Sequence, residues 1–438
     1  MRLKRELGFL TLISIVIGSL LGAGAFANPS LLAQYKLSGL IGLAIACLGA
    51  ISLSLVFSSL ASHLPKNGGP HVFVSEAFGR VAGFFTAWIY WIISWLSNAV
   101  LLSTIVGYLV IMTGDLRPME IVILESLIVL LITYINIVGV KFSGEVGVVL
   151  TILKLIPFFV LPVIFFTAFD TDNFKSSFQD MHFDFGFATT ISKVILLGFF
   201  GFIGVECATT PAERVKNPKK TIPKALIIGT AVVAVVYILN VVSMVGVVGF
   251  EKLGSTNAPY AFVIEKIFGS ASKIAIAVTS VIICVGTLNA WTLASGQIAY
   301  GAYEDKLFPK IFGKTNKAGA PIAALLLAAV GMITCFIVQQ SDSLKDSLIK
   351  LVGISCSIFL YIYLVCCVAY MKLIGKWKKT VSEKIRGYSL AGFSMIFCIY
   401  VLAGDVLWEN GLSTLSILGL FIALGIPVFV KNRGNIVT

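Results

Sequence analysis

The sequence predicts an all-α polytopic membrane protein with about twelve membrane-spanning helices. The first observation is composition, because 58% of the 438 residues are hydrophobic and only 12% are charged. A soluble domain carries about 25% charged residues. The second is a series of apolar runs, most of them long enough to cross a bilayer as a helix. The third is that glycines interrupt the first and the sixth of these runs near their middle. Broken helices at bilayer depth are tolerated where they line protein or a watery cavity, so the pair predicts a binding site within the bundle.

Hydropathy and the intervening polar loops place the spans in order along the chain. The expected spans are 8–34, 37–62, 81–113, 119–138, 145–169, 187–212, 223–249, 272–302, 319–339, 346–372, 388–405 and 412–430. An even number of spans places both termini on the same side of the membrane.

Basic residues concentrate in alternate loops. The N-terminus and the even-numbered loops hold about 23 of the 33 Lys and Arg residues, with runs at 214–224, 306–317 and 372–386. This bias predicts a multi-pass plasma membrane protein with both termini in the cytoplasm. The net charge of +12 therefore reflects orientation in the membrane and does not predict nucleic-acid binding. The eight cysteines lack metal-ligand spacing, and no metal or other cofactor is expected.

The first span is interrupted by Gly18, Gly22 and Gly24. A helix that restarts here presents free N–H groups around Ala23, Gly24 and Ala25, and a helix N-terminus favours an anion such as a substrate carboxylate. The alternative is close packing of glycines between helices. The matching interruption in the sixth span favours the binding site.

The sixth span contains Gly198, Gly201 and Gly204. Each glycine within a helix costs about 1 kcal/mol relative to alanine. The carbonyl groups near Phe200, Gly201 and Ile203 would end a half-helix there, and such groups favour an ammonium ion.

Glu206 follows this break and is the strongest candidate for a functional residue, because a carboxyl group at bilayer depth is costly. It is expected to couple protonation, or the binding of a cationic substrate, to gating. The alternative is a permanently protonated acid that joins two helices through a hydrogen bond.

Four motifs resemble those of the amino acid–polyamine–organocation transporters. They are Gly18-Ser-Leu-Leu-Gly-Ala-Gly24, the loop Leu64-Pro-Lys-Asn-Gly-Gly-Pro70 with Ala77-Phe-Gly79, Phe202-Ile-Gly-Val-Glu206 with 213–223, and Trp291-Thr-Leu-Ala-Ser-Gly-Gln297 with Leu307-Phe-Pro309. Together they extend over nearly the whole chain. Within them, Phe202–Glu206 and Trp291–Gln297, with the third-span run Tyr90–Asn98, are most similar to bacterial arginine/agmatine and putrescine/ornithine exchangers. The resemblance implies a LeuT-type fold, with inverted repeats at 8–169 and 187–372, two further helices at 388–430, and a bacterial inner membrane location.

Aromatic residues near the breaks are expected to hold or gate a cationic side chain, since cations bind aromatic faces. The candidates are Phe200, Trp291, Tyr90 and Trp95. Packing or an interfacial position is the other interpretation, and it is favoured for Trp95.

Small polar groups are a further set of candidates. They are Ser19, Asn98 and the run Ser355-Cys356-Ser357, which either contact substrate or join helices.

Two residues depart from the exchanger pattern that the resemblance implies. Phe200 stands where the arginine exchanger has a Trp that covers the substrate, which weakens cation–π attraction. Lys154 in the fifth span resembles proton-coupled members of broad specificity, in which a lysine amine replaces a sodium ion. Lys154 either exchanges a proton or stays charged and ties carbonyls of the first span to the fifth.

Five other ionisable residues are not expected to take part in transport. Glu125 and Lys193, near the outer ends of spans, are expected to reach the interface rather than form an ion path. His63, His71 and His182 are expected in loops without a role.

The sequence favours two transport functions over two other classes of protein. The leading function is a secondary transporter that exchanges a cationic amino acid for a related amino acid or polyamine. The alternative is proton-coupled uptake of varied amino acids through Lys154. An enzyme is disfavoured because no metal cluster, nucleophile elbow or phosphate loop is present in the sequence. A channel would not need paired broken helices. The resemblance also allows a homodimer.

Overall fold

The fold is that of a computed structural model, which describes residues 7–114, 116–138, 154–174, 185–317, 319–339, 344–377, 380–406 and 411–437. These residues are almost entirely helical. The longer helices are α1 (Phe9–Leu20), α2 (Ala23–Ala33), α3 (Lys36–His63), α4 (Pro70–Phe78), α5 (Arg80–Leu96), α6 (Asn98–Thr113), α7 (Pro118–Val138), α10 (Phe185–Phe199), α11 (Pro218–Val248), α12 (Phe250–Ser255), α13 (Pro259–Phe268), α14 (Ser270–Glu304), α15 (Ile322–Gln339), α16 (Leu344–Trp377), α17 (Val381–Gly404) and α18 (Gly411–Val437). An unlabelled apolar helix spans Lys154–Phe166.

Local sequence determines where several of these helices begin. Prolines at or near the first position start four of them, α4, α7, α11 and α13, because proline has no N–H to satisfy at a helix N-terminus. The helix α17 begins with a capping box, in which Thr380 accepts from the Glu383 amide and the Glu383 carboxylate accepts from the Thr380 amide.

The described helices establish a multi-pass membrane protein. Within the described residues, nine segments are long and apolar enough to cross a membrane, and α1 with α2 makes a tenth if the bent pair forms one span. Two shorter apolar helices, Lys154–Phe166 and Ile322–Val338, accompany them.

The helices fall close to the expected spans, with three local differences. The expected third span is divided at Ser97 into α5 and α6. The loop before it contains α4, and the loop between the expected seventh and eighth spans forms α12 and α13. The first part of the expected span 145–169 lies outside the described residues.

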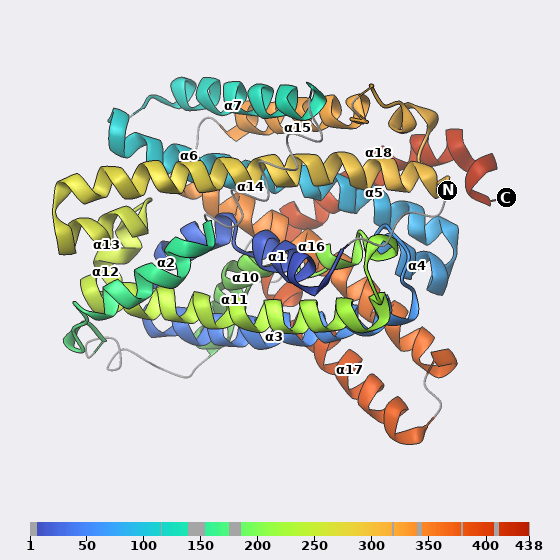
Figure 1. The fold of residues 1–438 in the computed structure, drawn as a ribbon, viewed down its shortest axis with the longest axis horizontal. Helices are drawn as coiled ribbons and strands as arrows, with labels where there is room; N and C mark the ends of the chain where they lie inside the picture. Colours follow the sequence, from blue (N-terminus) through green and yellow to red (C-terminus); the bar gives the residue numbers. More distant parts are fainter. Residues whose placement is uncertain are drawn as a thin grey trace.

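Most of the long helices run side by side along one axis of the molecule (Figure 1). The pairs α3–α11 and α6–α14 pack extensively against one another. Both termini lie at one end of the bundle, and α12 and α13 lie at the opposite end (Figure 1). We call these the terminal end and the α13 end.

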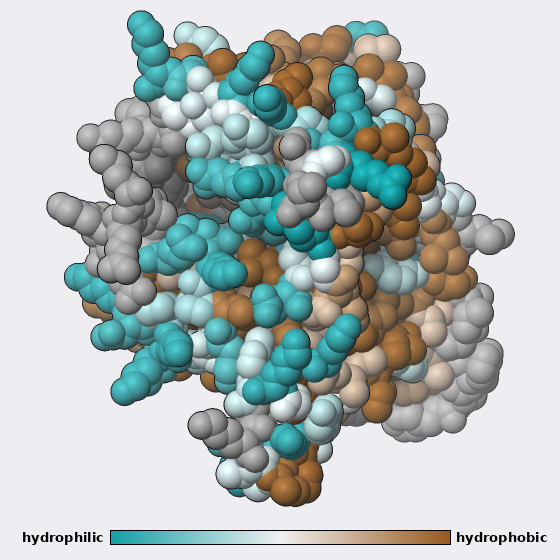
Figure 2. All heavy atoms as spheres, turned by 90° about the vertical axis from the view of Figure 1, so that its right-hand side faces the viewer, coloured by the Kyte–Doolittle hydropathy of each residue, from teal (hydrophilic) through white to brown (hydrophobic). Residues whose placement is uncertain are grey.

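The terminal end is polar and is held closed by contacts between loops. Hydrophilic side chains cover much of this face (Figure 2). The Gly68 amide donates to the Thr210 carbonyl at 3.2 Å. His71 Nε2 lies 3.0 Å from Asp305 Oδ2 and joins α4 to the residue that follows α14. The expectation that His71 lies in a loop was wrong, because it lies in α4 and is 1% exposed.

Candidate functional site

The site is built from two interruptions of helicity. The helix α1 ends at Leu20 and α2 begins at Ala23, with a bend of 41° between them. The helix α10 ends at Phe199 and continues as the short 3-10 turn η1 (Phe200–Phe202). Gly204 then adopts a φ of +103°, a conformation that residues with a Cβ rarely adopt. Both breaks lie at the predicted glycines.

The two breaks are in direct contact. A Cβ atom added to Gly24 would lie 2.5 Å from Gly201 Cα and 2.8 Å from Gly201 N. These distances are too short for any side chain, and both neighbouring atoms belong to the backbone. Glycine at position 24 therefore allows the two interrupted chains to approach one another.

Side chains also link the breaks. The Tyr237 hydroxyl, on α11, shares its hydrogen between the carbonyls of Leu20 at 2.6 Å and Gly201 at 3.0 Å. Ser19 Oγ donates to the Gly204 carbonyl at 3.3 Å, and also to a carbonyl of its own helix. Ser19 and Tyr237 thus join the first break to the second.

Several peptide groups that were expected to be free are bonded, so that part of the prediction was wrong. The Ala25 amide donates to the Gly22 carbonyl at 3.1 Å. The Phe200 carbonyl accepts from the Ile203 amide at 3.2 Å, and the Gly201 carbonyl accepts from Tyr237. The chain turns tightly at each break, which brings amides and carbonyls close enough to satisfy one another.

Some of the peptide groups that were expected to be free have no partner among the described residues. Within the part of the chain that is described, the Gly24 amide and the Ile203 carbonyl have no hydrogen-bond partner. Gly24 is the second residue of α2, after Ala23, and amides in the first turn have no acceptor within the helix. One donor and one acceptor therefore lie at the junction of the breaks.

Glu206 is fully buried two residues after Gly204. Its carboxyl group accepts from the Tyr90 hydroxyl on α5 at 2.7 Å and from the Tyr363 hydroxyl on α16. The Tyr363 hydroxyl in turn accepts from the Gly204 amide at 3.3 Å. No lysine or arginine of the described chain forms an ion pair with Glu206. A buried carboxyl group with two hydroxyl donors and no fixed cation can take up a proton or a cationic ligand.

Lys154 contacts the last turns of α1. Its amine donates to the Gly18 carbonyl and lies 3.4 Å from Thr287 Oγ1 on α14. The side chain is 3% exposed. The amine therefore joins three helices beside the first break. This is the geometry expected if Lys154 ties a carbonyl of the first span to the fifth span.

The four candidate aromatic residues do not form one cluster. Trp291 lies against the second break, since a Cβ added to Gly204 would be 3.0 Å from its ring. Tyr90 packs against Phe359, with ring centroids 6.0 Å apart. Phe200 is 7% exposed within η1. No ring contact joins any two of the four among the described residues.

Trp95 packs closely on α15. A Cβ added to Gly331 of that helix would lie 2.3 Å from the Trp95 ring. This agrees with the packing interpretation that the sequence favoured for this residue.

The small polar candidates divide into two groups. The amide of Asn98 and the hydroxyl of Ser355 are buried and have no partner within the described residues. Ser357 instead donates to Asp405 on the neighbouring segment at 2.8 Å, so it joins helices. Cys356 is fully buried. Unpartnered buried polar groups are rare, and a bound ligand is one explanation of them.

Two residues of the site were not predicted from the sequence, and one residue outside the site was misplaced. Tyr237 and Tyr363 carry hydroxyls in the middle of apolar spans, and this was the one signal that could have identified them. Glu125 does not reach the interface, because it is 4% exposed and accepts from Ser103 at 3.2 Å. His182 lies outside the described residues.

Comparison with known proteins shows which family this chain resembles. Residues 7–433 match the family model described as amino acid permease. The chain is 27% identical over 424 residues to the cadaverine/lysine antiporter of Escherichia coli strain K12, covering 95% of this chain and 92% of that protein. It is 27% identical over 450 residues to the arginine/ornithine antiporter of Pseudomonas aeruginosa, covering 99% and 92%. It is 26% identical over 470 residues to the putative arginine/ornithine antiporter of Bacillus subtilis, covering 99% and 98%.

Proposed function

The chain belongs to the amino acid permease family, and we propose that it exchanges a cationic amino acid of the arginine, ornithine or lysine class for a related amino acid or polyamine. It is a membrane transporter and not an enzyme. Three relatives with antiporter names, each aligned over most of its length, support exchange over one-way uptake. The central observation is the contact of Gly24 with Gly201 beside the buried carboxyl group of Glu206.

The remaining peptide groups supply the backbone part of the binding site. The Gly24 amide at the start of α2 would hold the substrate carboxylate, because the helix N-terminus favours an anion. The Ile203 carbonyl would hold the α-ammonium. Ala23 and Ala25, on either side of Gly24 in the chain, would belong to the same backbone site, and Ser19 would hold the two breaks together through Gly204.

Side chains around the breaks would hold the rest of the substrate. Trp291, which lies against Gly204, and Phe200 would face a cationic side chain. Asn98 would supply the hydrogen bonds that its buried amide lacks, and Cys356 would pack against the substrate.

Glu206 would couple binding to movement. A cation or proton that reaches its carboxyl group weakens the hydrogen bonds that the carboxylate accepts from the hydroxyls of Tyr90 and Tyr363. These tyrosines lie on α5 and α16, so the change would reach two further helices. Substrate occupancy would thereby favour one orientation of the site over the other.

The architecture that we propose is the LeuT-type arrangement. Residues 8–169 and 187–372 would form two inverted repeats that begin with the broken spans, and 388–430 would add two helices. Both termini would face the cytoplasm of a bacterial cell, because the basic runs at 214–224 and 306–317 lie at the terminal end.

A second candidate is proton-coupled uptake of varied amino acids. The observation that favours it is the buried amine of Lys154 beside the first break, with a carbonyl and a hydroxyl as its partners. An amine in such a setting can release its proton when the site changes orientation.

One experiment separates the two candidates. The purified protein is placed in vesicles preloaded with arginine, lysine, ornithine, cadaverine, putrescine or buffer, and the uptake of labelled arginine or lysine is followed with and without a pH gradient. Exchange predicts uptake that requires an internal counter-substrate. Uptake into empty vesicles under a pH gradient would replace exchange by proton symport, and the absence of uptake under all conditions would overturn both.

A further inference from the structure

A layer of aromatic rings separates the breaks from the α13 end. Phe26, two residues after Gly24, packs against Tyr108 of α6, Phe158 and Tyr260 of α13, with ring centroids 5.7, 4.9 and 5.4 Å away. All four rings are at most 3% exposed. The central site is thus closed on this side by side chains from four helices.

A pocket of about 200 Å³ lies on the far side of this layer. It is formed by the outer turns of α6, the turn between α12 and α13, and the first turns of α14. Gly107 of α6 lines it, nine residues beyond Asn98, which corresponds to about 13 Å along a helix. The pocket is therefore separate from the central site and lies nearer the α13 end.

The pocket combines an apolar wall with polar groups. Val110 and Phe262 contribute the apolar surface, and Thr256, Asn257 and Lys273 contribute the polar groups. A small solute with both an apolar and a charged part fits this lining better than an inorganic ion does.

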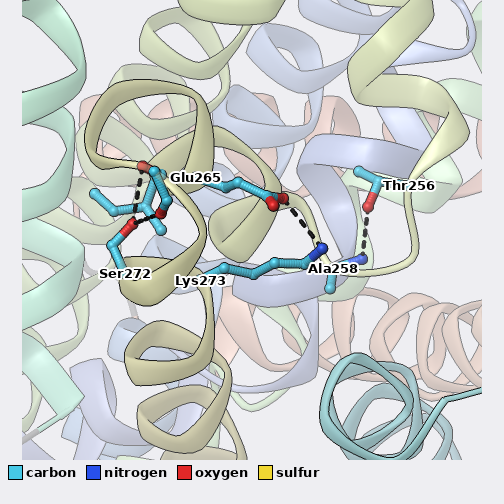
Figure 3. Close-up of polar contacts among 7 residues, drawn as sticks. Thr256, Ala258, Glu265, Ser272 and Lys273 are labelled. Carbon is cyan, nitrogen blue, oxygen red and sulfur yellow. Dashed lines mark hydrogen bonds and ion pairs between the residues drawn. The ribbon is translucent and has the colours of Figure 1, made fainter.

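Lys273, which lines the pocket, forms an ion pair with an acidic residue of α13. Lys273 Nζ is 3.1 Å from Glu265 Oε2, and the two side chains are 35% and 32% exposed. The Lys273 side chain extends past Glu265 toward the Thr256–Ala258 turn (Figure 3). Both ionic groups are therefore open to a ligand from water.

The elements that carry these charges are held firmly. Ser272 Oγ donates to the carbonyls of Ile264 at 3.2 Å and Gly269 at 2.6 Å, which fixes the corner between α13 and α14 (Figure 3). The Tyr260 hydroxyl donates to Asn240 of α11 at 2.9 Å. The backbone positions of Glu265 and Lys273 are therefore fixed relative to one another.

We propose that this pocket is a second binding site for α-amino acids, entered from the α13 end before the aromatic layer opens. The carboxylate of the amino acid binds the Lys273 ammonium, its α-ammonium binds the Glu265 carboxylate, and its side chain contacts Phe262 and Val110. A polyamine has no carboxylate for Lys273, so the site selects amino acids over polyamines. This inference rests on the proposed function, since it names a second binding site for the same transported substrate.

The first test measures binding without transport. Asn257→Cys places a thiol in the pocket, and Ser255→Cys places one on the exposed surface next to it. Labelling of the full-length protein by a membrane-impermeant maleimide is followed with increasing lysine or cadaverine, with the unsubstituted protein as background. We expect lysine to slow labelling at position 257 and leave position 255 unchanged, and cadaverine to protect neither. Adding Lys273→Gln should remove the protection.

Two outcomes of this test would overturn the proposal. One is equal labelling at position 257 with and without saturating lysine, whether or not the protein transports it. The other is equal protection by lysine and cadaverine, because the carboxylate would then play no part. Loss of exchange in the vesicle experiment alone would refute the proposed function and leave the labelling result to decide this site.

The second test uses transport kinetics and a matched variant. Lys273→Gln should raise the KM for lysine presented to the α13 end by roughly three- to tenfold, because it removes a partly exposed charged hydrogen bond. The KM for cadaverine, and the KM for lysine from the terminal end, should stay unchanged. Lys266→Gln removes an exposed lysine of the neighbouring helix α13 and should behave like the unsubstituted protein. If Lys273→Gln raised the KM for lysine equally from both ends, Lys273 would not act through this pocket. That result would overturn the proposal.

Discussion

The contact between the two breaks can be tested with a single methyl group. In Gly24→Ala the added Cβ would lie 2.5 Å from Gly201 Cα, 2.8 Å from Gly201 N and 3.4 Å from the Phe200 carbonyl carbon. Non-bonded carbon atoms prefer separations of about 3.5–4.0 Å. The breaks must therefore separate by about 1 Å, because backbone atoms cannot rotate away as side chains do.

This displacement should lower both the stability of the protein and its rate of exchange. Overpacking of a well-packed region lowers the free energy of unfolding by about 1–3 kcal/mol. Misplacement of positioned groups by about 1 Å can reduce a rate by about 100-fold. We expect Gly24→Ala to fold, with a lower thermal midpoint, and to exchange substrate at least about tenfold more slowly.

The assay compares this variant with Gly198→Ala in vesicles, together with thermal unfolding in detergent. A Cβ at position 198 would lie 3.5 Å from Ala46 Cβ and 3.5 Å from Leu43 Cα, which is ordinary contact. Alanine is also favoured over glycine in a helix by about 1 kcal/mol, so Gly198→Ala should keep its activity and stability. If Gly24→Ala exchanged at the unsubstituted rate with an unchanged midpoint, the breaks would not touch in the working protein.

Three further substitutions test the groups around the breaks. Glu206→Gln should slow exchange and flatten its dependence on pH, and an unchanged pH profile in vesicles would exclude a coupling role. Lys154→Gln should abolish exchange because α1 loses its tie at Gly18, whereas near-normal uptake would show that the amine is dispensable. Tyr237→Phe removes the hydroxyl shared by two carbonyls and should lower the free energy of unfolding by about 1–3 kcal/mol, measured as a lower thermal midpoint. Tyr388→Phe, at a residue that is 42% exposed, should leave that midpoint unchanged, and equal midpoints for both variants would contradict the bonding described.

The positions of the breaks could be predicted because their cause is local. Glycines in an apolar span weaken the helix where they occur, whatever the rest of the chain does. Gly22 and Gly204 both lie where helicity is lost. The burial of Glu206 and Lys154 could also be predicted, because both residues lie within apolar runs, and they are 0% and 3% exposed.

The partners of these groups could not be predicted, because they depend on how distant segments meet. Tyr363 lies 157 positions from Glu206, and Tyr237 lies 217 positions from Leu20. Nothing near Ala25 indicated that its amide would turn back to Gly22. The same reason explains Glu125, whose hydroxyl partner lies on another helix.

The closed terminal end also provides a way to observe opening. The Gly68 amide is bonded to the Thr210 carbonyl, and the nearby His71 ring is buried against Asp305. An amide in such a contact exchanges its hydrogen with solvent deuterium only while the contact is broken. Deuterium uptake at Gly68 would therefore measure how often this end opens, and a substrate that favours the closed arrangement would slow it.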